Sequence, residues 1–182
     1  MSIDDLTRLA QPPKCPLAFG NPLLWDSVER HLGTPLPADY KQLINLYGAG
    51  SFYDFLSFIS PFNRDGTLSE NGLFQWADNG REQYIGMKES FGVSVPEKFP
   101  FPAFPEHGGL LAVGGYEYGG TIYWLTIGDP DEWTIVVYSE DFFEFRKYDM
   151  SLSGFLTQWL SGILNPPMFD DDLCDRSKPI FR

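Results

Sequence analysis

Apolar positions in the first half of the chain follow helical spacing in three segments and strand-like spacing in one. Helical spacing predicts helices over residues 22–32 and 37–47, each followed by a glycine that favours helix termination. The aromatic-rich segment 51–59 indicates a strand, and a further helical pattern covers residues 69–89. Gly80 and Gly86 within that last pattern lower its helix propensity.

The second half of the chain predicts four short strands followed by a helix. Turn-forming residues separate the strand patterns, which is typical of an antiparallel meander. Ser151 is then a favourable N-cap for a helix with apolar residues from Leu152 to Ile163 along one face. The four strand patterns cover residues 110–115, 121–127, 132–138 and 142–148.

These elements predict one α+β domain over residues 21–164, with N-terminal helices, a mainly antiparallel sheet and a closing C-terminal helix. Prolines and polar residues predict an extended arm over residues 1–20 and an acidic, mobile tail over residues 165–182. The 182 residues include 16 Phe, 9 Tyr and 5 Trp, enough apolar area for one well-filled core. We therefore expect residues 21–164 alone to fold with nearly the melting temperature of the whole chain.

The chain is acidic, with 13 Lys and Arg against 25 Asp and Glu and a net charge of −12 at pH 7. Nucleic acids and anionic membranes are bound through clustered Lys and Arg, so we expect neither as a partner. The same charge suits a basic protein partner. The alternative is that the acidity only keeps the protein in solution.

The N-terminal segment and the spacing of the two cysteines indicate a protein of the reducing cytoplasm. The N-terminal segment has neither the positive charge nor the apolar stretch of a signal peptide. Cys15 and Cys174 lie far apart, without the spacing of a zinc site or a disulfide framework. We therefore expect a cytoplasmic protein.

Motifs for catalysis do not emerge from the sequence. His31 and His107 lack metal-type spacing, and no serine lies in a Gly-x-Ser-x-Gly turn. The glycine-rich segments 48–52 and 114–120 lack the lysine of a phosphate-binding loop. We expect no enzymatic activity, no metal and no cofactor, while a hydrolase that uses scattered carboxylates stays as the alternative from another class.

Charge placement is the informative feature. Between Phe99 and Phe145 there are eight acids and no Lys or Arg, and six of the eight lie within residues 129–144. Successive hairpin turns alternate between the two ends of a sheet, so these six are expected to form two clusters. Trp133 is a candidate aromatic anchor beside them, or alternatively a core residue. The expected partner-binding acids are Asp129, Asp131, Glu132, Glu140, Asp141 and Glu144.

Two segments together resemble the SUKH superfamily. The first is LGTPLPADYKQLINLYGAGSF (32–52), with Leu-Pro, an acid, Tyr-Lys, and an apolar helix closed by Tyr-Gly-x-Gly-x-Phe. The second is GGLLAVGGYEYGGTIYWLTIGDPDEWTIVVY (108–138), with a Gly-rich turn, a strand containing Trp124 and a Gly-x-Pro-x-x-Trp motif. The resemblance covers roughly residues 22–164, including the closing helix. Gly120 is followed by Thr121, where the family often has an acid.

The resemblance implies an α+β fold without an established active site. Many bacterial members are immunity proteins that bind and block a toxin domain, often a nuclease, and fungal relatives are regulators or scaffolds in cell-wall synthesis. The resemblance and the charge together predict a protein that binds a basic partner, with a toxin domain as the first hypothesis. A regulator or scaffold unrelated to toxins is the alternative.

Overall fold

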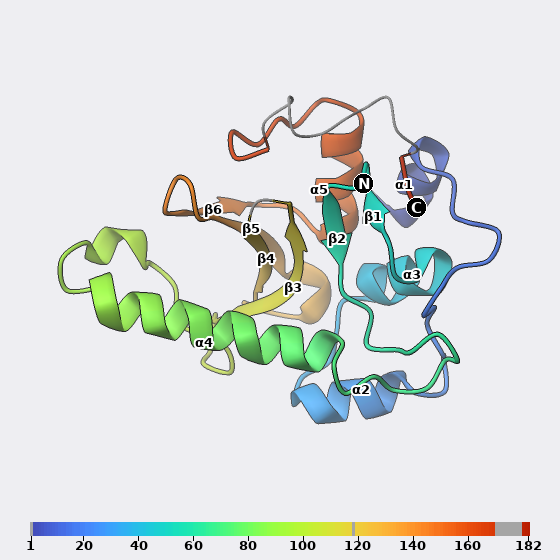
Figure 1. Ribbon diagram of the computed structural model, residues 1–182, viewed down its shortest axis with the longest axis horizontal. Helices are drawn as coiled ribbons and strands as arrows, with labels where there is room; N and C mark the ends of the chain where they lie inside the picture. The colour runs from blue at the N-terminus through green and yellow to red at the C-terminus, as the bar shows by residue number, and fades with distance from the viewer. Residues whose placement is uncertain (1, 118, 170–179) are drawn as a thin grey trace.

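A computed structural model describes residues 2–117, 119–169 and 180–182, and these form a single α+β arrangement (Figure 1). One antiparallel sheet contains six strands in chain order, from β1 at one edge to β6 at the other. Five α-helices and two 3₁₀ turns accompany it in the described residues. The helices are α1 (Ile3–Leu9), α2 (Trp25–Leu32), α3 (Ala38–Tyr47), α4 (Leu73–Phe91) and α5 (Leu152–Leu160). The strands are β1 (Ser51–Phe52), β2 (Leu56–Phe58), β3 (Leu110–Tyr116), β4 (Gly120–Leu125), β5 (Thr134–Ser139) and β6 (Glu144–Tyr148).

The predicted meander is confirmed as β3 to β6, and both faces of its central strands are buried. On one face Trp124 of β4 packs edge-on against Tyr40 of α3, with ring centroids 5.0 Å apart. On the opposite face Tyr123 lies under α4 and its hydroxyl approaches the Gly80 carbonyl at 3.4 Å. Alternation along the strands therefore divides the apolar side chains between two helical layers (Figure 1).

The helix predicted over residues 69–89 is α4, which is unbroken over 19 residues despite its two glycines. Gly80 lies on the buried side of the helix, where a Cβ atom would be only 2.4 Å from the Cβ of Ala112 in β3. The glycine thus allows the helix to approach the sheet closely, and this packing offsets its low helix propensity.

The single strand predicted over residues 51–59 is wrong, because the segment folds back on itself as the hairpin β1–β2. Tyr53 and Asp54 have φ angles of 53° and 55°, so they form a tight turn between the two short strands. Phe52 then pairs with Leu56. An aspartate in the middle of an aromatic run is the one sequence signal of this turn.

The extended arm predicted over residues 1–20 is wrong for residues 3–9, which form α1. Leu6 is fully buried against α3 and α5. The hydroxyl of Tyr47 in α3 donates a hydrogen bond to the Ala10 carbonyl just after α1. Further along, the Ser60 hydroxyl donates to the Ala18 carbonyl at 2.7 Å, so the N-terminal segment contributes to the core.

The closing helix is confirmed as α5, whose N-terminus is capped by the Ser151 hydroxyl accepting from the Gly154 amide at 3.3 Å. Parts of the predicted tail also pack on the domain. Phe169 is 5% exposed and lies against Phe55 and Trp159. Residues 180–182 pair with β1, while the acidic run 170–172 lies outside the described residues.

Buried tyrosines predict a loss of stability at high pH. Burial raises the pKa of Tyr47, Tyr84 and Tyr148 from 10.0 to about 12. A pKa that is higher in the folded state contributes stability that is complete below pH 10 and is lost as the pH rises towards 12. We expect the free energy of unfolding, measured with urea, to decrease steadily between pH 10 and pH 12. A constant value across that window would contradict this expectation.

Candidate partner-binding site

The loop between β4 and β5 carries the first predicted acidic cluster, and its acids are engaged in local structure. The Asp129 carboxylate accepts from the Asp131 amide at 3.1 Å, and the Glu132 carboxylate accepts from the Asp129 amide at 3.3 Å. These bonds form a capping box around the 3₁₀ turn Pro130–Glu132. The three side chains remain exposed, but their positions are set by the loop.

Asp131 also caps a helix distant in sequence. Its Oδ1 accepts a hydrogen bond of 2.6 Å from the amide of Ala38, the first residue of α3. The first amides of a helix have no intrahelical acceptor, and a carboxylate there also interacts favourably with the helix dipole. Asp131 is therefore a structural cap as well as a surface charge.

Replacing Asp131 with alanine should lower the free energy of unfolding by about 1 kcal/mol, because the Ala38 amide loses its acceptor. Chemical denaturation would measure the change. Glu140→Ala is the matched control, because Glu140 lies exposed in the β5–β6 turn and its loss should leave the stability almost unchanged. Equal effects of the two substitutions would show that the cap contributes nothing.

Trp133 is a core residue and therefore not the exposed anchor considered above. Its side chain is 5% exposed, and its ring centroid lies 5.8 Å from that of Trp124. The indole N–H approaches the Gly128 carbonyl at 3.4 Å. A partner cannot reach this side chain without opening the domain.

The second predicted cluster lies at the opposite end of the sheet, as the alternation of hairpin turns requires. Glu140 and Asp141 are exposed in the β5–β6 turn. Glu144, at the start of β6, instead pairs with Arg146 at 2.9 Å. Its charge is therefore partly neutralised within the strand.

Two other turns bring further acids to this end. The β3–β4 connection lies beside the β5–β6 turn, since the Tyr116 hydroxyl donates to the Tyr138 carbonyl at 3.1 Å across β4. The β1–β2 turn is adjacent, because the Glu117 amide donates to the Phe55 carbonyl at 2.9 Å. We call Glu117, Glu140 and Asp141 the acidic end of the sheet. In the described parts of the chain, no cation forms an ion pair with any of these three.

The negative potential at this end acts on neighbouring tyrosines. Burial is the main cause that raises the pKa of Tyr116, and the charge of Asp141 raises it further. Burial likewise raises the pKa of Tyr138, with a contribution from the charge of Glu140. The carboxylate charges of Asp141 and Glu140, which oppose ionisation of these tyrosines, would equally attract a cation.

A pocket of about 400 Å³ opens at the same end, beside the β1–β2 turn. Asp54 and Glu117 contribute carboxylates to its lining, while Trp76 of α4 and Tyr116 contribute aromatic surface. The sequence did not single out Asp54 or Trp76, because Asp54 fell within a predicted strand and Trp76 within a helical apolar pattern. Their proximity depends on how α4 crosses the sheet.

The two histidines lie in separate environments. His31 stacks on Phe74, with ring centroids 4.0 Å apart, and His107 is exposed in the loop before β3. Throughout residues 2–117, 119–169 and 180–182, no three His, Cys, Asp or Glu side chains are grouped so that they could hold a metal ion. No helix in the described structure is long and apolar enough to cross a bilayer.

Comparison with known families supports the resemblance noted in the sequence. A family model described as SUKH_6, SMI1-KNR4 cell-wall, matches residues 23–156. That range runs from just before α2 into α5, and so includes the whole sheet and the helices on both of its faces. No curated protein matches the chain.

Proposed function

Since the chain belongs to the SMI1-KNR4 family of SUKH proteins, we propose that it is a non-enzymatic binding protein that neutralises a cationic toxin domain through the acidic end of its sheet. The observation that carries the proposal is the convergence of Glu117, Glu140 and Asp141 from two neighbouring turns, with no ion pair to any described cation. A nuclease holds phosphates with positive charge, and a negative protein surface is complementary to that groove.

The acidic end suits an inhibitor kinetically as well. Complementary charges raise the rate of association, and an inhibitor must bind before its target acts on substrate. The net charge of −12 extends this attraction beyond the contact itself. Asp129, Asp131 and Glu132 add negative potential at the other end of the sheet, but their roles in the capping box and on α3 make them the weaker candidates for contact.

The first test is the identity of the partner. A toxin domain encoded immediately beside this chain should bind it and lose its toxicity when the two are expressed together. Binding without neutralisation of a toxin, or a neighbouring gene for a cell-wall or metabolic protein, would instead favour the regulatory alternative.

Reversing two charges at the acidic end should then weaken binding. Against that toxin domain at low salt, Glu140→Lys with Asp141→Lys is expected to reduce the affinity by about tenfold or more and to flatten its salt dependence. The melting temperature should change little, because exposed turn charges contribute little to stability. Isothermal titration at two salt concentrations measures the effect.

The matched control is Asp26→Lys with Glu70→Lys, which changes the net charge equally at exposed positions on α2 and in the loop before α4. We expect a much smaller loss of affinity from the control. If both pairs weaken binding equally, the attraction depends on net charge alone. If neither weakens it, the acidic end is not the binding surface.

A further inference from the structure

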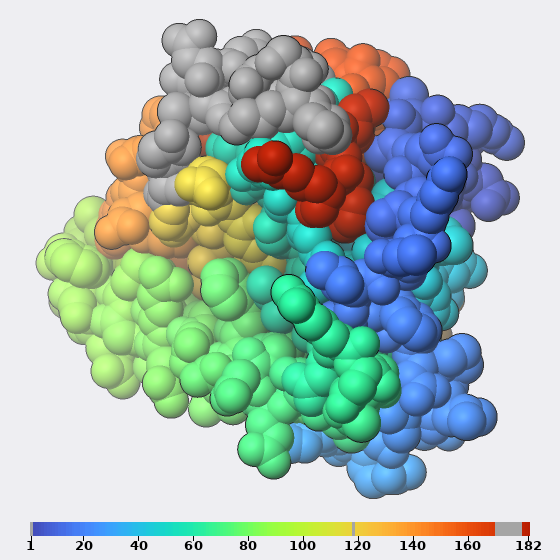
Figure 2. Space-filling view, turned by 45° about the vertical axis from the view of Figure 1, so that its right-hand side comes forward, coloured from blue at the N-terminus to red at the C-terminus, as the bar shows by residue number. Residues whose placement is uncertain are grey.

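Residues 180–182 pair with β1, the edge of the sheet, through an antiparallel β-bridge. The Ser51 amide donates to the Arg182 carbonyl at 2.8 Å, and the Arg182 amide donates back to the Ser51 carbonyl at 3.1 Å. The Tyr53 amide donates to the Ile180 carbonyl at 2.9 Å, and Phe181 lies opposite Phe52 in antiparallel register. Figure 2 shows residues 180–182 in red on the surface, against the β1 segment. An edge strand offers unpaired amides and carbonyls, and this segment satisfies those of β1.

The edge also recognises the side chain of Phe181. The ring centroid lies 4.9 Å from those of both Tyr47 and Phe52, in edge-on geometry. Gly50 leaves room for this approach, because a Cβ there would lie 2.5 Å from the Arg182 carbonyl oxygen and from the Phe181 ring. The β1 edge thus offers backbone hydrogen bonds to an extended segment and aromatic contacts to one of its side chains.

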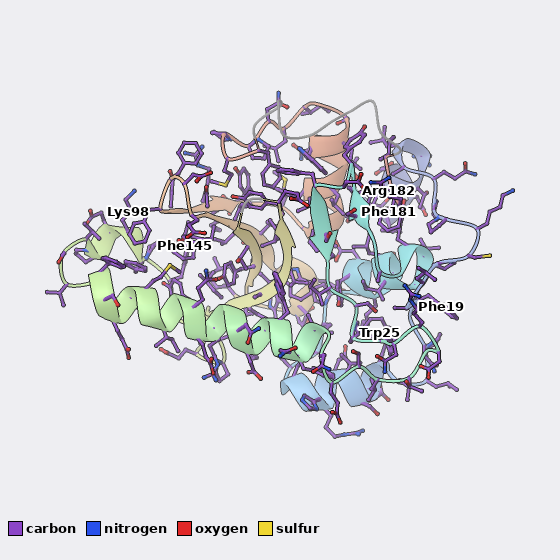
Figure 3. All side chains as sticks on the ribbon, in the orientation of Figure 1. Phe19, Trp25, Lys98, Phe145, Phe181 and Arg182 are labelled. Atoms are coloured by element: carbon purple, nitrogen blue, oxygen red, sulfur yellow. The ribbon has the colours of Figure 1, made fainter. Side chains whose placement is uncertain are left out.

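Arg182, which follows Phe181, places a cation at the β1–β2 turn, next to the acidic end of the sheet. The Arg182 guanidinium forms an ion pair with Asp54 in the β1–β2 turn. Figure 3 labels Arg182 next to Phe181, close to β1. Asp54 lines the same pocket as Glu117. The Arg182 side chain is 62% exposed and that of Asp54 is 20% exposed, so the cation lies at the rim where another cation has access.

We propose that β1 is a strand-docking edge that residues 180–182 occupy in cis, and that an extended segment of the cationic partner displaces them. The partner segment pairs with β1 and places an aromatic side chain and a cation where Phe181 and Arg182 lie. This inference rests on the proposed function only for the charge of the partner. Displacement is feasible because the cis contact is short. It consists of three backbone hydrogen bonds, the packing of one aromatic ring and one partly exposed ion pair, and a partner segment with the same groups would replace each of them.

The edge can be tested without the partner, by hydrogen exchange of the Ser51 and Tyr53 amides. The release variant is the full chain with Phe181→Ala and Arg182→Glu, and the probe is a blocked Pro-Ile-Phe-Arg peptide. We expect the two amides to exchange roughly tenfold faster in the release variant. The peptide at about 1 mM should restore their protection, whereas a peptide with alanine in place of phenylalanine should not. The Ile59 amide, which donates to the Val113 carbonyl at 2.9 Å, reports that the variant is folded.

Two results would overturn the edge as a docking site. One is unchanged exchange at Ser51 and Tyr53 in the release variant while Ile59 stays protected. The other is failure of the peptide to protect the exposed amides, which would leave residues 180–182 as a purely structural strand.

Binding of the confirmed partner distinguishes this inference from the proposed function. Removing a cis competitor raises the apparent affinity, so the release variant should bind the partner about threefold to tenfold more tightly than the unsubstituted chain does. Leu23→Ala with Arg64→Glu is the control, because it makes the same kinds of change at exposed positions away from β1. If the release and control variants bind equally while the Glu140 and Asp141 reversal weakens binding, the docking edge is wrong and the proposed function stands.

Discussion

Replacing Trp159 with alanine is expected to lower the free energy of unfolding by about 3–5 kcal/mol, because it leaves a large cavity in the core. Trp159 is 1% exposed in α5. Its ring lies 6.0 Å from that of Tyr53 and 5.6 Å from that of Phe169, so it joins the β1–β2 turn to the segment after α5. The loss should appear in urea denaturation as a lower midpoint with an unchanged slope.

Gln158→Ala is the matched control, since Gln158 precedes Trp159 in the same helix and is only partly buried. Its replacement should change the stability by less than about 0.5 kcal/mol. A Trp159→Ala effect as small as that of the control would mean that the core collapses around the missing ring, and that α5 contributes little through this side chain.

Removal of residues 1–20 is expected to cost at least about 4 kcal/mol, from lost burial of Leu6 and from orphaned polar groups. Without this segment, the buried hydroxyls of Tyr47 and Ser60 lose the carbonyl acceptors of Ala10 and Ala18. The Ala49 amide also loses its 2.6 Å bond to the Leu17 carbonyl. Since whole domains are stable by only about 5–15 kcal/mol, the shortened chain should melt far below the full chain or lose cooperative unfolding.

This prediction replaces the expectation that residues 21–164 suffice. Two point variants separate the loss of α1 packing from the effect of shortening the chain. Leu6→Ala should cost about 2–3 kcal/mol, whereas Leu9→Ala, at 38% exposure, should be nearly neutral. Calorimetry of the three variants measures the effects, and an unaltered melting temperature after removal of residues 1–20 would support the original expectation.

The meander and the closing helix were predictable because their signals are local. Turn residues between the four apolar segments that become β3, β4, β5 and β6 predicted the hairpins. Ser151 and the apolar pattern after it predicted α5, and the motifs in 32–52 and 108–138 predicted the family. The separation of the acids into two clusters followed from the same topology, since successive turns of a meander lie at opposite ends.

The tertiary structure decided which polar and terminal residues stabilise the fold and which remain accessible to a partner. Asp131 caps α3 across 93 residues of sequence, and Trp133 fills the core, so neither is a free surface group. Leu6 is buried because α1 packs against α3 and α5. Residues 180–182 likewise find their backbone hydrogen-bond partners at Ser51 and Tyr53, which lie far from them in the sequence. Contacts between residues so distant in sequence leave no local period or spacing, because they depend on how whole elements pack rather than on the preferences of a few adjacent residues.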